Sequence, residues 1–169
     1  LGLSDTTVYL NVSAHTIMHQ EFCKIFSRFV EENGIKENEF GLEITETAEL
    51  EDTKKAGESL ERLKKRGIKI ALDDFGAGYA SLKYIRDLPI DVVKLDRHFT
   101  SNISDPSTSR LIKFVSDVCA ELNLEMIGEG IETEKEKNMM IELGCVTGQG
   151  FLMHMPSFIE DIKKENNDG

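Results

Sequence analysis

The chain has 169 residues, of which 40% are hydrophobic, and this is enough for one domain with a buried core. Its formal net charge of −11 argues against a general nucleic-acid-binding or anionic-membrane surface, because both need an excess of lysine and arginine. Cys23, Cys119 and Cys145 lie far apart without a CxxC pair, so we expect reduced, buried thiols in a cytoplasmic protein rather than a structural zinc site. No apolar run reaches the roughly 20 residues of a membrane span, and the first residues form no basic leader, so we expect no membrane insertion.

Strand-like segments alternate with helical segments along the whole chain. Runs rich in β-branched and apolar residues predict six strands, near residues 8–12, 40–45, 68–73, 92–96, 125–129 and 146–151. Between them, apolar residues recur at helical spacing. Two such stripes consist of Phe22, Ile25, Phe26, Phe29 and Val30, and of Leu111, Phe114, Val115, Val118 and Leu122. This alternation predicts an α/β fold with a parallel sheet, either open and doubly wound or arranged as a barrel.

A polar or charged residue stands at the carboxyl end of nearly every predicted strand. In chain order these residues are Asn11, Glu43, Glu46, Asp73, Asp74, Lys94, Asp96, Glu129, Glu132 and Gln149. The carboxyl ends of parallel strands share one face, so we expect these side chains to converge there. Any one acidic residue taken alone is more often a helix N-cap or a solvated loop residue. The whole set instead indicates metal coordination, and oxygen ligands without clustered His or Cys favour Mg²⁺ or Mn²⁺.

The adjacent residues Asp73 and Asp74 lead directly into a glycine-containing loop. Successive strand residues point to opposite faces, but both carboxylates can turn toward one centre where the strand breaks, and a cation then offsets their repulsion. Gly76 and Gly78 permit unusual backbone angles, so this loop is a candidate switch. A Rossmann nucleotide site is a minor alternative, because Ser81 stands where the third glycine of GxGxxG belongs. The histidines show no ligand-like spacing, and surface or packing roles are expected for His15, His19, His98 and His154.

Six segments of the sequence, in their order and spacing, resemble the EAL domain family of bacterial cyclic di-GMP phosphodiesterases. They are "LNVSA", "LEITE", "ALDDFGAGYASL", "VVKLDRHFT", "IGEGIET" and "GQGFLMHMP". The resemblance implies a TIM-type barrel with a modified first strand, and hydrolysis of cyclic di-GMP to linear pGpG with two Mg²⁺ or Mn²⁺ ions. It further implies no DNA or RNA partner, a homodimer, and attachment to sensory or GGDEF domains in a parent protein that can itself be membrane-anchored.

The same resemblance implies a role for each matching residue. Asn11, Glu43, Asp73 and Asp74 match metal ligands, Lys94 matches the lysine that positions the attacking water, and Glu129 matches the general base. Supporting or substrate-binding roles fall to Asp96, Glu132 and Gln149. Glu46 matches the glutamate that holds the glycine loop of Gly76 and Gly78, which in this family links dimerisation to metal occupancy.

The sequence also departs from the family pattern. The Glu-Ala-Leu segment that names the family lies upstream of "LNVSA" and is not in these 169 residues. We therefore expect residues 1–169 to form a single EAL-type domain that is incomplete at its N-terminus, with about six of eight strands and a frayed tail at 163–169. Gly128 and Ala77 replace the usual alanine and the usual threonine or serine. Two alternatives stay open: a non-catalytic cyclic di-GMP receptor or interaction domain, and a fragment that turns over substrate feebly or not at all.

Overall fold

The computed structural model describes residues 6–45, 52–77 and 81–158. Three of the expectations above fall outside these ranges. They concern Glu46, Gly78 and the tail at 163–169.

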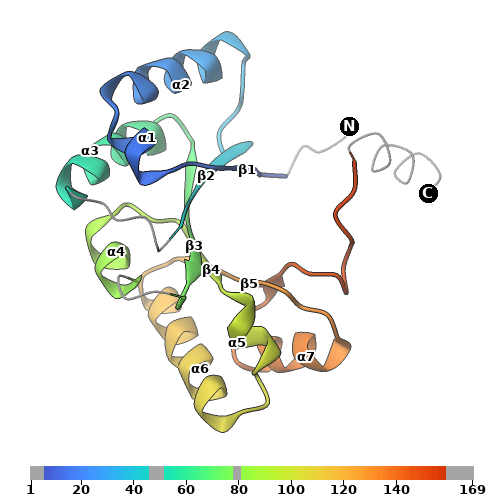
Figure 1. The fold of residues 1–169 in the computed structure, drawn as a ribbon. Helices are drawn as coiled ribbons and strands as arrows, with labels where there is room; N and C mark the ends of the chain where they lie inside the picture. Colours follow the sequence, from blue (N-terminus) through green and yellow to red (C-terminus); the bar gives the residue numbers. More distant parts are fainter. Residues whose placement is uncertain (1–5, 46–51, 78–80, 159–169) are drawn as a thin grey trace.

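Six parallel strands form one sheet, in which they follow one another in chain order from β1 to β6 (Figure 1). The strands are β1 (Val8–Asn11), β2 (Phe40–Thr45), β3 (Lys69–Phe75), β4 (Val92–Leu95), β5 (Glu125–Gly128) and β6 (Thr147–Gly148). The helices are α1 (Ala14–Met18), α2 (Gln20–Glu32), α3 (Thr53–Lys64), α4 (Ser81–Asp87), α5 (Arg97–Ser101), α6 (Pro106–Glu121) and α7 (Glu134–Glu142).

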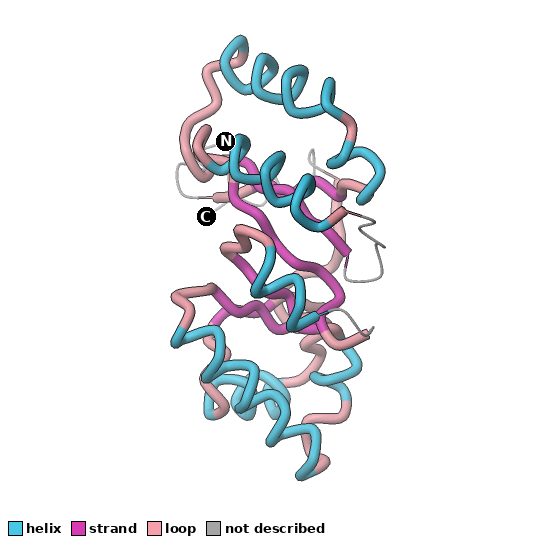
Figure 2. The backbone as a smooth tube through the Cα atoms, turned by 90° about the vertical axis from the view of Figure 1, so that its left-hand side faces the viewer, coloured by secondary structure: helices cyan, strands magenta, loops and turns pink. Residues whose placement is uncertain are grey.

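The strand order decides between the two predicted arrangements. A doubly wound sheet reverses its strand order at a switch point, whereas a barrel keeps the order of the chain. Here the order has no reversal, and the sheet curls into a half-barrel with helices along its outside (Figures 1 and 2). The predicted α/β fold with a parallel sheet is thus confirmed, and its arrangement is that of a TIM-type barrel.

The observed strands match the predicted ones within two residues, except for the last. That strand was expected over 146–151 and covers only Thr147 and Gly148. Gln149 N–H still donates to Gly128 O of β5 at 2.8 Å, but from there the backbone pairs with a loop: Ile131 N–H donates to Gln149 O at 3.1 Å, and Leu152 N–H donates to Ile131 O at 3.0 Å. The turn residue Gly150 lies so close to Ile131 that an added Cβ would come within 2.3 Å of the Ile131 amide nitrogen.

Side-chain caps fix where α6 and α7 begin. Asp105 caps α6 by accepting hydrogen bonds from the Ser107 and Thr108 amides at 3.0 and 2.9 Å, and Pro106 occupies the first turn, where its missing N–H costs nothing. At α7, Thr133 and Glu136 form a reciprocal capping box. Such caps satisfy amides that have no partner within the helix, and each stabilises the fold by about 1 kcal/mol.

The hydrophobic core lies between the sheet and the outer helices. Side chains alternate along each strand, so one half of them faces the helices and the other half faces the concave side of the sheet. The helix-facing residues of β2, β3 and β4 include Leu42, Ile44, Ile70, Leu72, Val93 and Leu95, and all are fully buried in one cluster with residues of α3, α6 and α7.

The two predicted helix stripes are only partly correct. Val30 and Val115 are buried, but Ile25 on α2 is 66% exposed, and Leu111 and Phe114 on α6 are 54% and 53% exposed. The buried face of α6 is rotated relative to the predicted stripe, because it consists of Ile112, Val115, Ser116 and Cys119.

The concave side of the sheet is polar at its ends. Toward the amino ends of the strands, Lys69 Nζ lies 3.5 Å from Glu125 Oε2. Between the ends, the ring of Tyr9 covers Gly41, whose ideal Cβ position lies 2.3 Å from Tyr9 Cε1. Among the helices of the described ranges, none combines the length and apolar character that a bilayer crossing requires.

Candidate functional site

One lysine forms the centre of the carboxyl-end cluster. Lys94 on β4 is 5% exposed, and its Nζ lies 2.8 Å from one carboxylate oxygen each of Glu43, Asp73 and Glu129. These three residues come from β2, from β3 and from the residue after β5. The parallel arrangement therefore brings together groups that are 86 residues apart in sequence, as the strand-end pattern predicted.

The charges of this cluster do not balance. Three carboxylates share one ammonium group, and Asp74 adds a further carboxylate nearby. Burial opposes the charged form of Lys94, but its hydrogen bonds to Asp73, Glu129 and Glu43 outweigh burial and raise the pKa of Lys94 above its ordinary value. Lys94 is thus a permanent cation at neutral pH.

The pKa of Glu129 is also raised. Its main cause is desolvation by burial, and the charges of Asp73 and Asp74 add to it, while the hydrogen bond and charge of Lys94 oppose it. Gln149 Nε2 donates a hydrogen bond of 2.7 Å to Glu129 Oε1, the same oxygen that contacts Lys94. Glu129 is therefore a carboxylate with an enhanced proton affinity and a fixed orientation.

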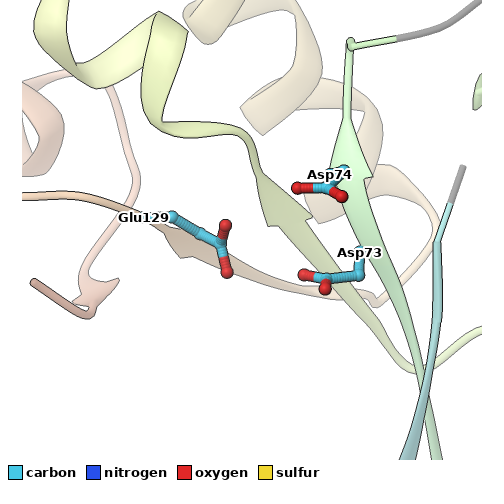
Figure 3. A group of neighbouring side chains, drawn as sticks. All are labelled: Asp73, Asp74 and Glu129. Atoms are coloured by element: carbon cyan, nitrogen blue, oxygen red, sulfur yellow. The ribbon is translucent and has the colours of Figure 1, made fainter. Parts of the chain in front are cut away.

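A β-bulge explains how the side chains of two adjacent aspartates can point toward the same place. In the pairing of β3 with β4, Leu72 lies opposite Val93 and Phe75 lies opposite Leu95, so β3 contains one extra residue in this interval. Asp74 lies in this interval, and its backbone has the left-handed conformation, with φ 55°. Because the bulge breaks the strict alternation of faces, the Asp73 and Asp74 carboxylates both point toward Glu129 (Figure 3).

These three carboxylates lie close enough to bind one metal ion. One oxygen from each of Asp73, Asp74 and Glu129 lies within 4.8 Å of the other two. Asp73 Oδ1 is buried, and among the described residues its polar contact is with the Lys94 ammonium group, at 2.8 Å. Hard oxygen ligands, excess negative charge and a buried carboxylate oxygen with spare lone pairs together fit Mg²⁺ or Mn²⁺.

The remaining candidate residues lie at the edge of this cluster, cap a helix or take part in a turn of the backbone. Asn11 is paired in register with Glu43, at the exposed end of β1. Glu132 is exposed and lines a neighbouring pocket together with Gln149. Asp96 caps α5, because its Oδ1 accepts the His98 amide at 2.8 Å. Gly76 follows the bulge with φ 96°.

The pocket beside Glu129 contains residues that sequence reasoning did not single out. It has a volume of about 480 Å³ and is lined by Glu129, Glu132 and Gln149 together with Arg97, Phe151, His154, Met155 and Pro156. The additional residues stand within two quoted segments: Arg97 in "VVKLDRHFT", and Phe151, His154, Met155 and Pro156 in "GQGFLMHMP". Position in those segments was the available signal, but residue type alone did not distinguish His154 from the other exposed histidines.

A larger groove, of about 600 Å³, lies away from these carboxylates. It runs between α3 and the end of α4, and its wall carries both signs of charge, with Arg62 and Lys65 beside Glu58 and Glu61. We place the functional site at the smaller pocket, because it is lined by Glu129, the carboxylate that contacts the buried Lys94.

Known proteins share both this sequence pattern and this fold. The EAL domain profile matches residues 2–156. The cyclic di-GMP phosphodiesterase PA2567 of Pseudomonas aeruginosa is 33% identical over 155 residues, which are 91% of this chain and 26% of that protein. The chain thus spans about a quarter of the length of this relative.

Two solved structures extend the comparison to three dimensions. The crystal structure of the EAL domain of Mycobacterium smegmatis DcpA superposes with a TM-score of 0.92 at 28% identity, covering 98% of this chain and 75% of that one. The manganese and cyclic di-GMP complex of Klebsiella pneumoniae BlrP1 gives a TM-score of 0.81 at 25% identity, covering 89% and 39%. Because the family profile covers most of the sequence and the strand order is that of a barrel, this chain belongs to the EAL domain family.

Proposed function

We propose that the chain is the larger part of a metal-dependent phosphodiesterase domain that hydrolyses cyclic di-GMP to linear pGpG. The single observation that carries this proposal is the Lys94 cluster: a buried cation between Glu43, Asp73 and Glu129, with Asp74 turned toward the same centre. A relative with the phosphodiesterase name and a neighbour bound to cyclic di-GMP support the substrate.

The metal ligands would be Asp73, Asp74, Glu43 and Asn11. When bound there, divalent ions would supply Lewis-acid stabilisation of the phosphodiester and would lower the pKa of the attacking water. The manganese in the BlrP1 complex supports Mn²⁺ as one suitable ion.

The residues of the chain would divide the remaining chemistry among them. Glu129, whose pKa is raised, would accept the proton of the water at the oxygen that does not contact Lys94. Lys94 would stay protonated and stabilise the negative charge that develops on the phosphate. Gln149 would hold the Glu129 carboxylate in place through its 2.7 Å hydrogen bond.

The test compares this chain with a version extended upstream, each incubated with cyclic di-GMP and Mn²⁺ while pGpG is followed by chromatography. We expect the extended version to form pGpG and the 169-residue chain to do so feebly or not at all, because six strands do not close a barrel. Glu129→Gln in the extended version should abolish turnover.

The same experiment separates the second candidate function, a non-catalytic receptor. Tight binding of cyclic di-GMP by the extended version without any pGpG would favour the receptor over the enzyme. Near-normal hydrolysis by the 169-residue chain would instead show that the six strands suffice.

The proposal includes a homodimer, attachment to sensory or GGDEF domains, and a cytoplasmic location. The apolar side chains of Leu111 and Phe114 on α6 and of Leu122 directly after it, each more than half exposed, support self-association. Sedimentation of the extended version should give a dimer that Phe114→Glu converts to a monomer, whereas a monomer at all concentrations would remove the dimer from the proposal.

A further inference from the structure

A phenylalanine on α5 occupies the space where Gly76 lacks a side chain. An ideal Cβ on Gly76 would lie 2.2 Å from Phe99 Cε2 and 2.6 Å from Phe99 Cζ. Carbon atoms that are not bonded prefer about 3.5–4.0 Å. The Phe99 ring therefore lies directly against the Gly76 backbone, and only glycine allows this approach.

Gly76 in turn continues the bulge that carries the aspartates. Asp74 has φ 55° and Gly76 has φ 96°, and the turn closes with a hydrogen bond of 3.0 Å from the Ala77 amide to Asp74 O. A left-handed aspartate costs more than a left-handed glycine, so this conformation persists only where neighbouring atoms hold it.

Phe99 is itself anchored to the strand that carries Lys94. Its amide donates to Asp96 O at 3.0 Å, and the Asp96 amide donates to Phe75 O at 3.3 Å across the β3 and β4 pair. The ring is partly buried and packs against the core. Phe99 thus joins β4, which supplies Lys94, to the turn that follows Asp74.

We propose that Phe99 is a positioning residue, which holds the Asp73–Asp74 turn in the conformation that groups the carboxylates with Glu129. The inference concerns the turn geometry, and it rests on the proposed function only for the metal that these carboxylates would bind.

The first test replaces the ring. In Phe99→Ala we expect faster hydrogen exchange at the Ala77 amide, and Mn²⁺ binding to the 169-residue chain weaker by about 10-fold or more, the usual cost of losing a group that orients metal ligands. Phe99→Leu, which keeps part of the contact, should fall between Phe99→Ala and the unmodified chain in both measurements.

The matched control is Phe26→Ala. Phe26 on α2 is also a partly buried phenylalanine that packs against the core, and it stacks on Phe22 with ring centroids 5.6 Å apart, in a helix that carries no candidate ligand. This variant loses similar packing, so a purely structural effect would appear in both variants. We expect its Ala77 exchange and its Mn²⁺ affinity to equal those of the unmodified chain.

A second pair of variants tests the contact itself. Gly76→Ala should weaken Mn²⁺ binding, because the new methyl group collides with the ring and the backbone angle is unfavourable for alanine. Adding Phe99→Ala removes the collision, so the loss of Mn²⁺ affinity in the double variant should be smaller than the two single losses combined. Losses that simply add would contradict the contact.

The outcomes separate this inference from the proposed function. Absence of pGpG from the extended version would count against the phosphodiesterase and leave the turn unaffected. Unchanged Ala77 exchange in Phe99→Ala would overturn the positioning role, whether or not the chain binds Mn²⁺.

Discussion

At the scale of single residues, the structure depends most on the balance of charge around Lys94. Its side chain is 7% exposed, and the three carboxylates that contact it are 11–15% exposed. Removing one partner of a buried ionic group usually costs more than the pair itself contributes, because the other charges stay buried without compensation.

Lys94→Met is therefore expected to lower the free energy of unfolding by about 3–5 kcal/mol at pH 7 without metal. Because Lys94 opposes the raised pKa of Glu129, its removal would raise that pKa further, and the penalty shrinks as Glu129 becomes protonated at lower pH. Urea unfolding at pH 5 and pH 8 should show the larger loss at pH 8.

Lys69→Met is the matched control, since Lys69 faces Glu125 across the same concave side but at 3.5 Å and with 30% exposure. We expect a loss of about 0–1 kcal/mol. Equal losses for the two lysine variants would contradict the central role of Lys94.

The cysteines give a second prediction at this scale. All three are buried and unpaired, as the sequence predicted, and burial raises the pKa of Cys119 and of Cys145 to about 11. At pH 8 only about one in a thousand of such thiols is ionised, against roughly a quarter for a free cysteine. DTNB should therefore label the native chain at least about 100-fold more slowly than the urea-unfolded chain. The unfolded chain should release three equivalents of thionitrobenzoate, one for each cysteine. Fast labelling of Cys119 or Cys145 in the native chain would contradict this burial.

At the scale of elements, the packing of β1 on β2 depends on the absence of a side chain at Gly41. The Tyr9 ring fills that space, and half-burial together with nearby carboxylates raises the pKa of Tyr9 to about 12. Gly41→Ala should displace the ring and cost about 1–3 kcal/mol. Thermal unfolding checks this, and Tyr9→Ala in the same chain should remove most of the added cost. If Gly41→Ala is equally destabilising when Tyr9 is alanine, the need for glycine at position 41 does not come from the Tyr9 ring.

Sequence patterns predicted the positions of the strands and helices better than they predicted which helix faces are buried. The alternation of strands and helices was correct throughout, because apolar runs and turn residues are local signals. The buried face of α6 was misassigned, since Leu111 and Phe114 are as apolar as the residues that do become buried. Which of two adjacent apolar stripes packs depends on the position of the sheet, and no local pattern contains that information.

The site was predictable in its residue types but not in its geometry. Strand ends identified Lys94, Glu43, Asp73 and Glu129, which the fold does bring together. The bulge at Asp74 could not be foreseen, because it arises from the pairing of β3 with β4. The replacement of the usual alanine by Gly128 also has a tertiary reason: a Cβ there would lie 2.4 Å from Met140 Cε, so Met140 occupies that space.

At the scale of the whole molecule, the chain is an acidic half-barrel (Figure 1), and the carboxylate cluster lies at the carboxyl ends of its strands. Its two edge strands, β1 and β6, have no partner on their outer sides among the described residues. Strands that would complete a barrel would join these edges, which is why we expect the upstream extension to raise activity.

Anomalous diffraction from crystals of the chain soaked in Mn²⁺ tests whether the clustered carboxylates bind a metal ion. We expect anomalous peaks within bonding distance, about 2.0–2.3 Å, of oxygens of Asp73 and Asp74. Crystals saturated with Mn²⁺ that show no peak between these carboxylates and Glu129 would contradict this expectation.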